Sequence, residues 1–139
     1  MSLNHTLATS AFSNVTTLGG RLESPKFGNL TVSSGLNLST PAAAKTAAYT
    51  ATTNDYLIPV NTAGGAVVVT LPAAAAVPAP VNGFSLVVLD SGGSASSNNI
   101  TISAGAGTTL VGPAGAGTIS ANRSSQKFIY YNTVYYQLV

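Results

Sequence analysis

Charge is what this sequence lacks most. Five basic and three acidic residues make up 6% of the 139 positions, against about 25% in an ordinary soluble domain. Alanine, glycine and side chains with hydroxyl or amide groups fill the chain instead. Such a surface can pack against another protein without burying unpaired charges, which is costly. The low charge therefore favours a protein that works in an assembly.

Other missing residue types exclude several kinds of chemistry. There is no cysteine, so disulfides and thiolate metal sites are excluded. The single histidine, His5, falls in a segment expected to be extended, where a catalytic base is not expected. Asp55 and Asp90 could form a glycosidase pair, but an aspartate before Ser-Gly-Gly is ordinary turn chemistry. Asp90 with Asn98 and Asn99 offers only one carboxylate to calcium. We expect no enzyme, no cofactor and no metal site.

The basic residues and the apolar segments do not indicate nucleic acid or membrane. The net charge is +2, and the bases are spread from Arg21 to Lys127 rather than clustered as in a nucleic-acid interface. The first residues lack the basic and apolar regions of a secretion signal. The most apolar window, 66–89, is interrupted by prolines and does not read as a transmembrane helix.

The sequence changes character near residue 45. Residues 1–45 are rich in Ser, Thr, Asn and Leu, with no long apolar run. We predict an extended N-terminal arm that becomes ordered on a partner and carries a short β-hairpin over 26–40, where Gly35 suits the turn. The candidate partner contacts of the arm are its larger apolar side chains, Leu3, Leu7, Phe12, Leu18 and Leu22.

Residues 46–139 read as a β-domain. Short runs rich in β-branched residues alternate with turn residues, which is typical of a sandwich or barrel. The expected strands cover 49–52, 55–60, 66–71, 84–89, 99–103, 127–131 and 134–139. The segment Ala-Gly-Ala-Gly-Thr at 104–108 returns at 114–118, which predicts two similar turns rather than a solenoid. We predict a small antiparallel β-sandwich or barrel, similar to a jelly roll.

The last predicted hairpin is apolar on both of its faces. A strand that is wet on one side should alternate apolar and polar residues, and a small domain has little interior in which to bury both sides. Two interpretations stay open: the hairpin is the centre of the sandwich, or one of its faces is a subunit interface. The candidate interface residues are Phe128, Tyr130, Tyr131, Tyr135 and Tyr136.

From Tyr49 onward the sequence resembles a domain found near the C-termini of phage tail fibre and other virion-surface proteins. The resemblance is carried by the segments 49–58, 66–72, 87–92 and 98–102, followed by the closing aromatic strand. It implies an antiparallel β-sandwich, commonly trimeric, mounted on a virus particle. Where such domains often carry a base before the aspartate and close on tryptophan, this chain has Leu89 and the pair Tyr135-Tyr136.

The resemblance implies a structural protein of a phage virion, placed at the virion surface after assembly in the host cytoplasm. An arm followed by one small domain suits a capsid decoration, or cement, protein that clamps neighbouring coat subunits. The alternative is a short tail fibre or tail adaptor that binds a host-surface carbohydrate. The expected partners are further copies of the chain, as a homotrimer, and the major capsid protein or tail proteins.

Overall fold

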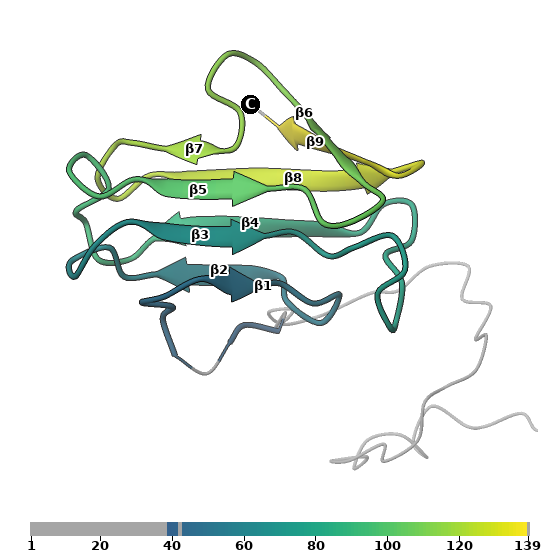
Figure 1. The fold of residues 1–139 in the computed structure, drawn as a ribbon, viewed down its shortest axis with the longest axis horizontal. Coiled ribbons are helices and arrows are strands. Elements are labelled where there is room, and N and C mark those ends of the chain that lie inside the picture. The colour runs from purple at the N-terminus through teal and green to yellow at the C-terminus, as the bar shows by residue number, and fades with distance from the viewer. Residues whose placement is uncertain (1–38, 42, 139) are drawn as a thin grey trace, which may run out of the picture. The chain divides into compact units, whose positions relative to one another are not determined.

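The computed structural model describes residues 39–41 and 43–138, and all the regular structure in these residues is β-structure (Figure 1). This confirms the all-β prediction. The strands are β1 (Tyr49–Thr50), β2 (Leu57–Val60), β3 (Val67–Thr70), β4 (Ser85–Asp90), β5 (Ile100–Ser103), β6 (Thr109–Val111), β7 (Thr118–Ile119), β8 (Ser125–Tyr131) and β9 (Val134–Leu138). No helix long and apolar enough to span a membrane occurs in the described residues.

The strands form two sheets, and the chain crosses from one to the other after each of its first seven strands. The four-stranded sheet has the order β1-β3-β5-β7, and the five-stranded sheet has the order β2-β4-β8-β9-β6. Neighbours β1, β3 and β5 are parallel, as are β2 and β4. The chain from β1 to β5 therefore winds as a short coil whose turns stack on one another, as the two layers in Figure 1 show.

The antiparallel prediction is wrong for this first part of the domain. Alternating apolar residues predict a strand but do not determine its partner or whether that partner runs parallel or antiparallel. Parallel strands need a crossover connection, which here is a strand of the opposite sheet. The result is two mixed sheets, an arrangement compatible with a sandwich but not with a jelly roll of antiparallel strands.

After β6 the chain reverses, and antiparallel pairs close the coil. β7 pairs with β5, β8 with β4 and β9 with β8, each antiparallel, while β6 runs parallel to β9. The predicted terminal hairpin is therefore present. Its turn residues Asn132 and Thr133 have φ values of 48° and 63°, the left-handed conformation that matches the twist of a two-residue hairpin.

The repeated Gly-Ala-Gly-Thr segments form two similar turns, as predicted. The Thr108 amide donates to the Gly105 carbonyl and the Thr118 amide to the Gly115 carbonyl, both at 3.1 Å. The third residue of each turn is a glycine with positive φ, which glycine adopts at no steric cost. Strand β6 follows the first turn and β7 begins with the last residue of the second.

The residues before β1 extend the five-stranded sheet past β2. Lys45 forms a parallel bridge with Val60, and the Ser39 carbonyl accepts a 2.8 Å hydrogen bond from the Tyr56 amide. The domain thus includes Ser39 and Lys45, two residues of the segment 1–45 that the sequence predicts to be an arm. Residues 26–38 of the hairpin predicted over 26–40 lie outside the described residues, as does the start of the arm with Leu3, Leu7, Phe12, Leu18 and Leu22.

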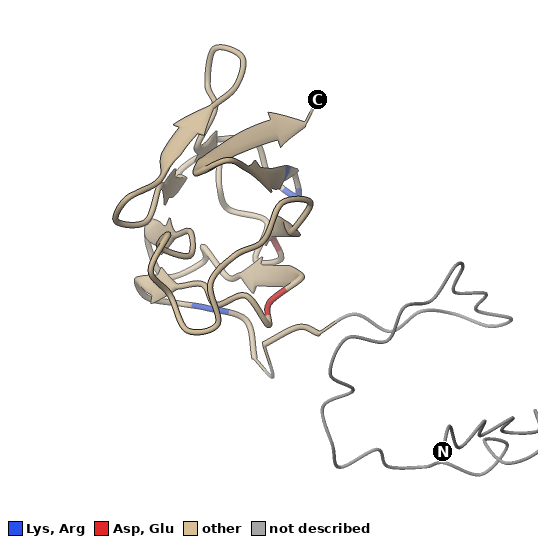
Figure 2. Cartoon of the chain, turned by 90° about the vertical axis from the view of Figure 1, so that its right-hand side faces the viewer, with Lys and Arg blue, Asp and Glu red and all other residues tan. Residues whose placement is uncertain are grey.

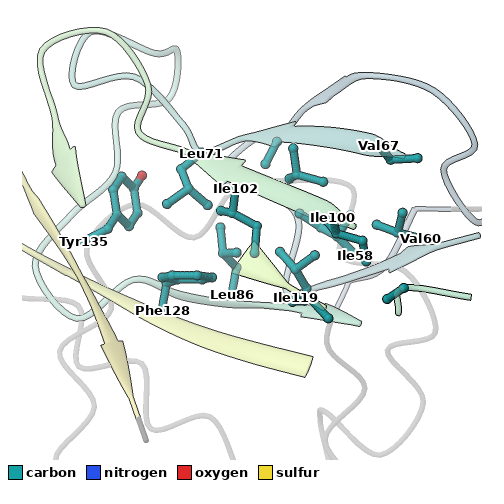
Figure 3. Packing of buried hydrophobic residues seen from close by; sticks show 14 of the residues in the cluster. Ile58, Val60, Val67, Leu71, Leu86, Ile100, Ile102, Ile119, Phe128 and Tyr135 are labelled. Atoms are coloured by element: carbon teal, nitrogen blue, oxygen red, sulfur yellow. The ribbon is translucent and has the colours of Figure 1, made fainter. Parts of the chain in front are cut away.

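One apolar core lies between the two sheets (Figure 3). Every second residue of β2, β3, β4 and β5 is buried, and so are Phe128 and Tyr130 of β8, because successive side chains of a strand point to opposite sides. Figure 3 shows Phe128 and Tyr135 of the terminal hairpin near Leu71 and Ile102. Burying each large apolar side chain contributes about 1.5–3 kcal/mol, so this core holds the two sheets together.

Candidate assembly surface

The two described aspartates do not meet. Val60, the last residue of β2, pairs with Asp90, whereas Asp55 precedes Leu57, the first residue of β2, which pairs with Val87. The carboxylates therefore lie at opposite ends of the β2–β4 pair, and the geometry contradicts the glycosidase pair considered above. The described residues also contain no group of three or more His, Cys, Asp or Glu side chains arranged to hold a metal ion.

Asp90 is a buried structural residue whose oxygens are occupied by donors of its own domain. Oδ1 accepts from Thr62 Oγ1 at 2.7 Å and from the Gly93 amide at 3.0 Å. Oδ2 accepts from the Arg123 amide at 3.0 Å and from the Ala95 amide at 3.3 Å. Burial by itself raises the pKa of Asp90, but these hydrogen bonds outweigh burial and hold the pKa below its usual value. Asp90 thus joins three loops, and it offers no free oxygen to calcium.

Asp55 has a similar local role at the other end of the domain. Its Oδ2 accepts hydrogen bonds from the Tyr49 hydroxyl and the Thr52 amide, both at 2.8 Å. Burial first, and then the hydrogen bond and charge of Asp55, raise the pKa of Tyr49 to about 12. The Lys45 ammonium lies 4.3 Å from the centre of the Tyr49 ring, a favourable cation–π distance.

With both aspartates buried, the charges that remain accessible in the described residues are basic. They belong to Lys45, Arg123 and Lys127. Figure 2 shows how few positions of the described domain carry charge at all. Apart from these three bases, the accessible side chains of the described domain are apolar or uncharged polar groups.

The side of the five-stranded sheet that points away from the core is mostly apolar, and we call it the outer apolar face; its polar members are Ser85, Thr109, Ser125 and Lys127. Its most accessible side chains are Tyr131 (59% exposed), Val111 (49%), Leu138 (43%) and Tyr136 (41%). The described residues form two layers, and no third sheet covers this side. The apolar members of the face are Leu57, Pro59, Val87, Leu89, Val111, Ile129, Tyr131, Val134, Tyr136 and Leu138.

Tyr136 lies in the middle of one half of this face. In the sheet it is flanked by Ile129 on β8 and by Val111 on β6. Facing side chains of neighbouring strands stand about 4.5–5.5 Å apart at Cβ, so these three are in contact range. Leu138, two residues further along β9, pairs with Lys127, the one charged residue of the face among those described.

The outer side of the four-stranded sheet has a different chemistry, and we call it the hydroxyl face. Thr50, Thr70 and Ser103 lie side by side on β1, β3 and β5, with Thr70 Oγ1 3.3 Å from Ser103 Oγ. Val68 on β3 is a large apolar exception, 45% exposed. Hydroxyl groups keep their hydrogen bonds in water, so this face needs no cover, whereas the apolar face leaves hydrophobic area in solvent.

The structure divides the five predicted interface residues between the two sides of the hairpin. Phe128, Tyr130 and Tyr135 are 0%, 6% and 0% exposed, so they are core residues, and their assignment to an interface is wrong. They point toward the four-stranded sheet because they occupy the inward positions of β8 and β9. Tyr131 and Tyr136 occupy the outward positions and belong to the outer apolar face.

Sequence reasoning missed the members of the face outside the last hairpin. Val87 and Leu89 point outward from β4, next to the inward Leu86 and Val88. The signal was present, because the run 84–89 is apolar at both odd and even positions. A strand with two apolar sides in a two-layer domain leaves one side without a layer to cover it.

The comparisons with known proteins do not name this surface. The sequence matches no protein-family model, and a search of curated proteins finds no match. The resemblance to phage domains therefore stays a prediction from the sequence.

Proposed function

We propose that this protein is a structural component of a bacteriophage virion, and specifically a capsid decoration protein. The observation that carries the proposal is the outer apolar face, which is apolar across all five strands of its sheet while the opposite side of the domain is hydroxylated. A contiguous exposed apolar surface marks a site of protein–protein contact. A subunit that is buried in an assembly on one side and wet on the other needs this asymmetry.

The state of the acidic groups supports a role without catalysis. Asp55 and Asp90 each accept hydrogen bonds from their own domain, and they lie at different ends of the β2–β4 pair. General acid–base catalysis needs a titratable side chain within hydrogen-bond reach of a substrate. What the described domain presents to a partner is a sheet face, which suits packing against coat subunits or further copies of the chain.

A short tail fibre or tail adaptor is the second candidate. It is favoured by the stacked parallel turns from β1 to β5, since stacked coils of this kind extend along one axis. The sequence resemblance covers both tail and capsid proteins. The predicted arm before the domain favours decoration, because an arm can cross neighbouring coat subunits.

Copy number in the particle tests the proposal. Purified virions, with the major coat protein as an internal mass-spectrometric standard, should contain this chain at a copy number approaching that of the coat protein. A copy number of a few per particle would replace decoration with the tail assignment. A chain that expresses in infected cells but is missing from purified particles would refute both.

A further inference from the structure

We propose that Asn82 is a site of spontaneous deamidation whose rate is controlled by the β8–β9 hairpin, so that it reacts when the turn over residues 81–84 separates from that hairpin. Asn82 is the one asparagine of the sequence that a glycine follows. Asparagine is a thermally labile residue, and glycine has no side chain to shield its backbone nitrogen. Both Asn82 and Gly83 are exposed, so water reaches them. This modification is independent of the proposed function.

Deamidation joins two neighbouring groups of the chain. The Gly83 nitrogen gives up its proton and attacks Cγ of Asn82, the bond from Cγ to the side-chain nitrogen breaks, and that nitrogen takes up the proton and leaves as ammonia. Water then opens the cyclic imide at either of its carbonyl carbons and gives aspartate or isoaspartate. The reaction therefore needs a Gly83 amide that can release its proton and an Asn82 side chain that can turn toward it.

In the folded chain both reacting groups are tied to the hairpin. The Gly83 amide donates a 2.9 Å hydrogen bond to the Tyr130 carbonyl, which engages the proton that the reaction has to remove. Asn82 Oδ1 accepts a 2.9 Å hydrogen bond from the Asn132 amide, which holds the side chain toward the hairpin turn. Tyr130 belongs to β8 and Asn132 lies between β8 and β9, so one element restrains both groups.

Further backbone bonds fix the turn beside the hairpin. The Phe84 amide donates to the Val81 carbonyl at 2.9 Å, and the φ of Gly83 is 90°, as at the third residue of a type II turn. The Tyr130 amide donates to the Phe84 carbonyl at 2.8 Å, so the turn is joined to β8 by bonds in both directions. Breaking two or more such bonds before the reaction should slow deamidation by about tenfold or more.

The isoaspartate product makes the separation irreversible. In isoaspartate the main chain runs through the former side chain, which lengthens the backbone before Gly83 by a methylene group. The hydrogen bonds of the Gly83 and Phe84 amides then no longer form at their native positions. Chains whose hairpin stays closed remain unmodified, whereas chains that have opened are altered covalently and lose contacts of this turn.

Mass spectrometry of the full chain after incubation at mildly alkaline pH tests this, with a matched second site in the same molecule. Ala63→Asn places an asparagine before Gly64 in an exposed turn, where the Gly64 amide donates to no protein acceptor within the described residues. In the folded variant we expect deamidation at Asn82 to be slower than at position 63 by about tenfold or more. In urea that unfolds the chain, the two positions should react at similar rates.

The wild-type chain keeps the test decisive if the variant fails to fold, which circular dichroism would show, because its folded and urea-unfolded forms can be compared at Asn82 alone. Equal rates in these two forms overturn the inference, as do equal rates at both positions of the folded variant, since the hairpin then gives no protection. An Asn82 that stays intact in the unfolded chain overturns it too, because it is then no modification site.

Discussion

Tyr135 and Tyr136 are adjacent in the sequence and lie on opposite sides of β9. Tyr135 is fully buried and donates a 3.0 Å hydrogen bond to the Pro72 carbonyl, while Tyr136 stands on the outer apolar face. Burial, together with the neighbouring Tyr130, raises the pKa of Tyr135. Two identical side chains thus have different surroundings, one in the core between the two sheets and one on the solvent side of its sheet.

This difference predicts that the same mutation lowers the stability at one tyrosine and leaves it nearly unchanged at the other. Tyr135→Phe removes the donor and leaves the buried Pro72 carbonyl without its hydrogen bond, which should lower the free energy of unfolding by about 1–3 kcal/mol. Tyr136→Phe should change it by less than about 0.5 kcal/mol. Urea unfolding followed by circular dichroism measures both, and equal losses would contradict the assignment.

Removing the Asp90 carboxylate should strongly destabilise the domain. Asp90→Ala leaves Thr62 Oγ1 and the amides of Gly93, Ala95 and Arg123 without an acceptor. Lost hydrogen bonds to a charged acceptor cost about 1.5–3 kcal/mol each when measured singly, so we expect a total loss of at least about 3 kcal/mol. Lys127→Ala, an exposed change on the central strand β8, is the control and should be nearly neutral.

The same carboxylate predicts how stability depends on pH. The pKa of Asp90 is lower in the folded chain than in the unfolded chain, so the unfolded chain binds more protons between the two values. Stability is fully present above the unfolded pKa and is lost as the pH falls through the folded pKa. Unfolding curves from neutral to acidic pH should show this decrease. A matching decrease in Asp90→Asn would assign it to other groups.

Local features of this fold could be predicted from the sequence, and long-range ones could not. The hairpin turn at Asn132-Thr133 and the repeated Gly-Ala-Gly-Thr turns depend on residues close in the chain, so their patterns indicated them correctly. The parallel pairing of Val69 with Ile102 was missed. Strand alternation says which side chains share a face but not which strand lies alongside.

The candidate surface was predicted in part for the same reason. Alternation correctly separated Tyr130 from Tyr131, but it could not say which of the two would face the core. That depends on the position of the four-stranded sheet, which packs on the side of Phe128 and Tyr135. The burial of Asp90 was also missed, because its hydrogen-bond donors are contributed by three separate loops.

The repeated turns offer a test of local packing. A methyl group on Gly105 would lie 2.6 Å from the Ala73 amide nitrogen and closer still to the Leu71 carbonyl oxygen. Gly105→Ala should therefore destabilise the domain by about 1–3 kcal/mol or more. Gly64→Ala meets no atom within 4 Å and has no positive φ, so it should be neutral or slightly stabilising. Thermal unfolding distinguishes the two, and equal midpoints would contradict the close approach.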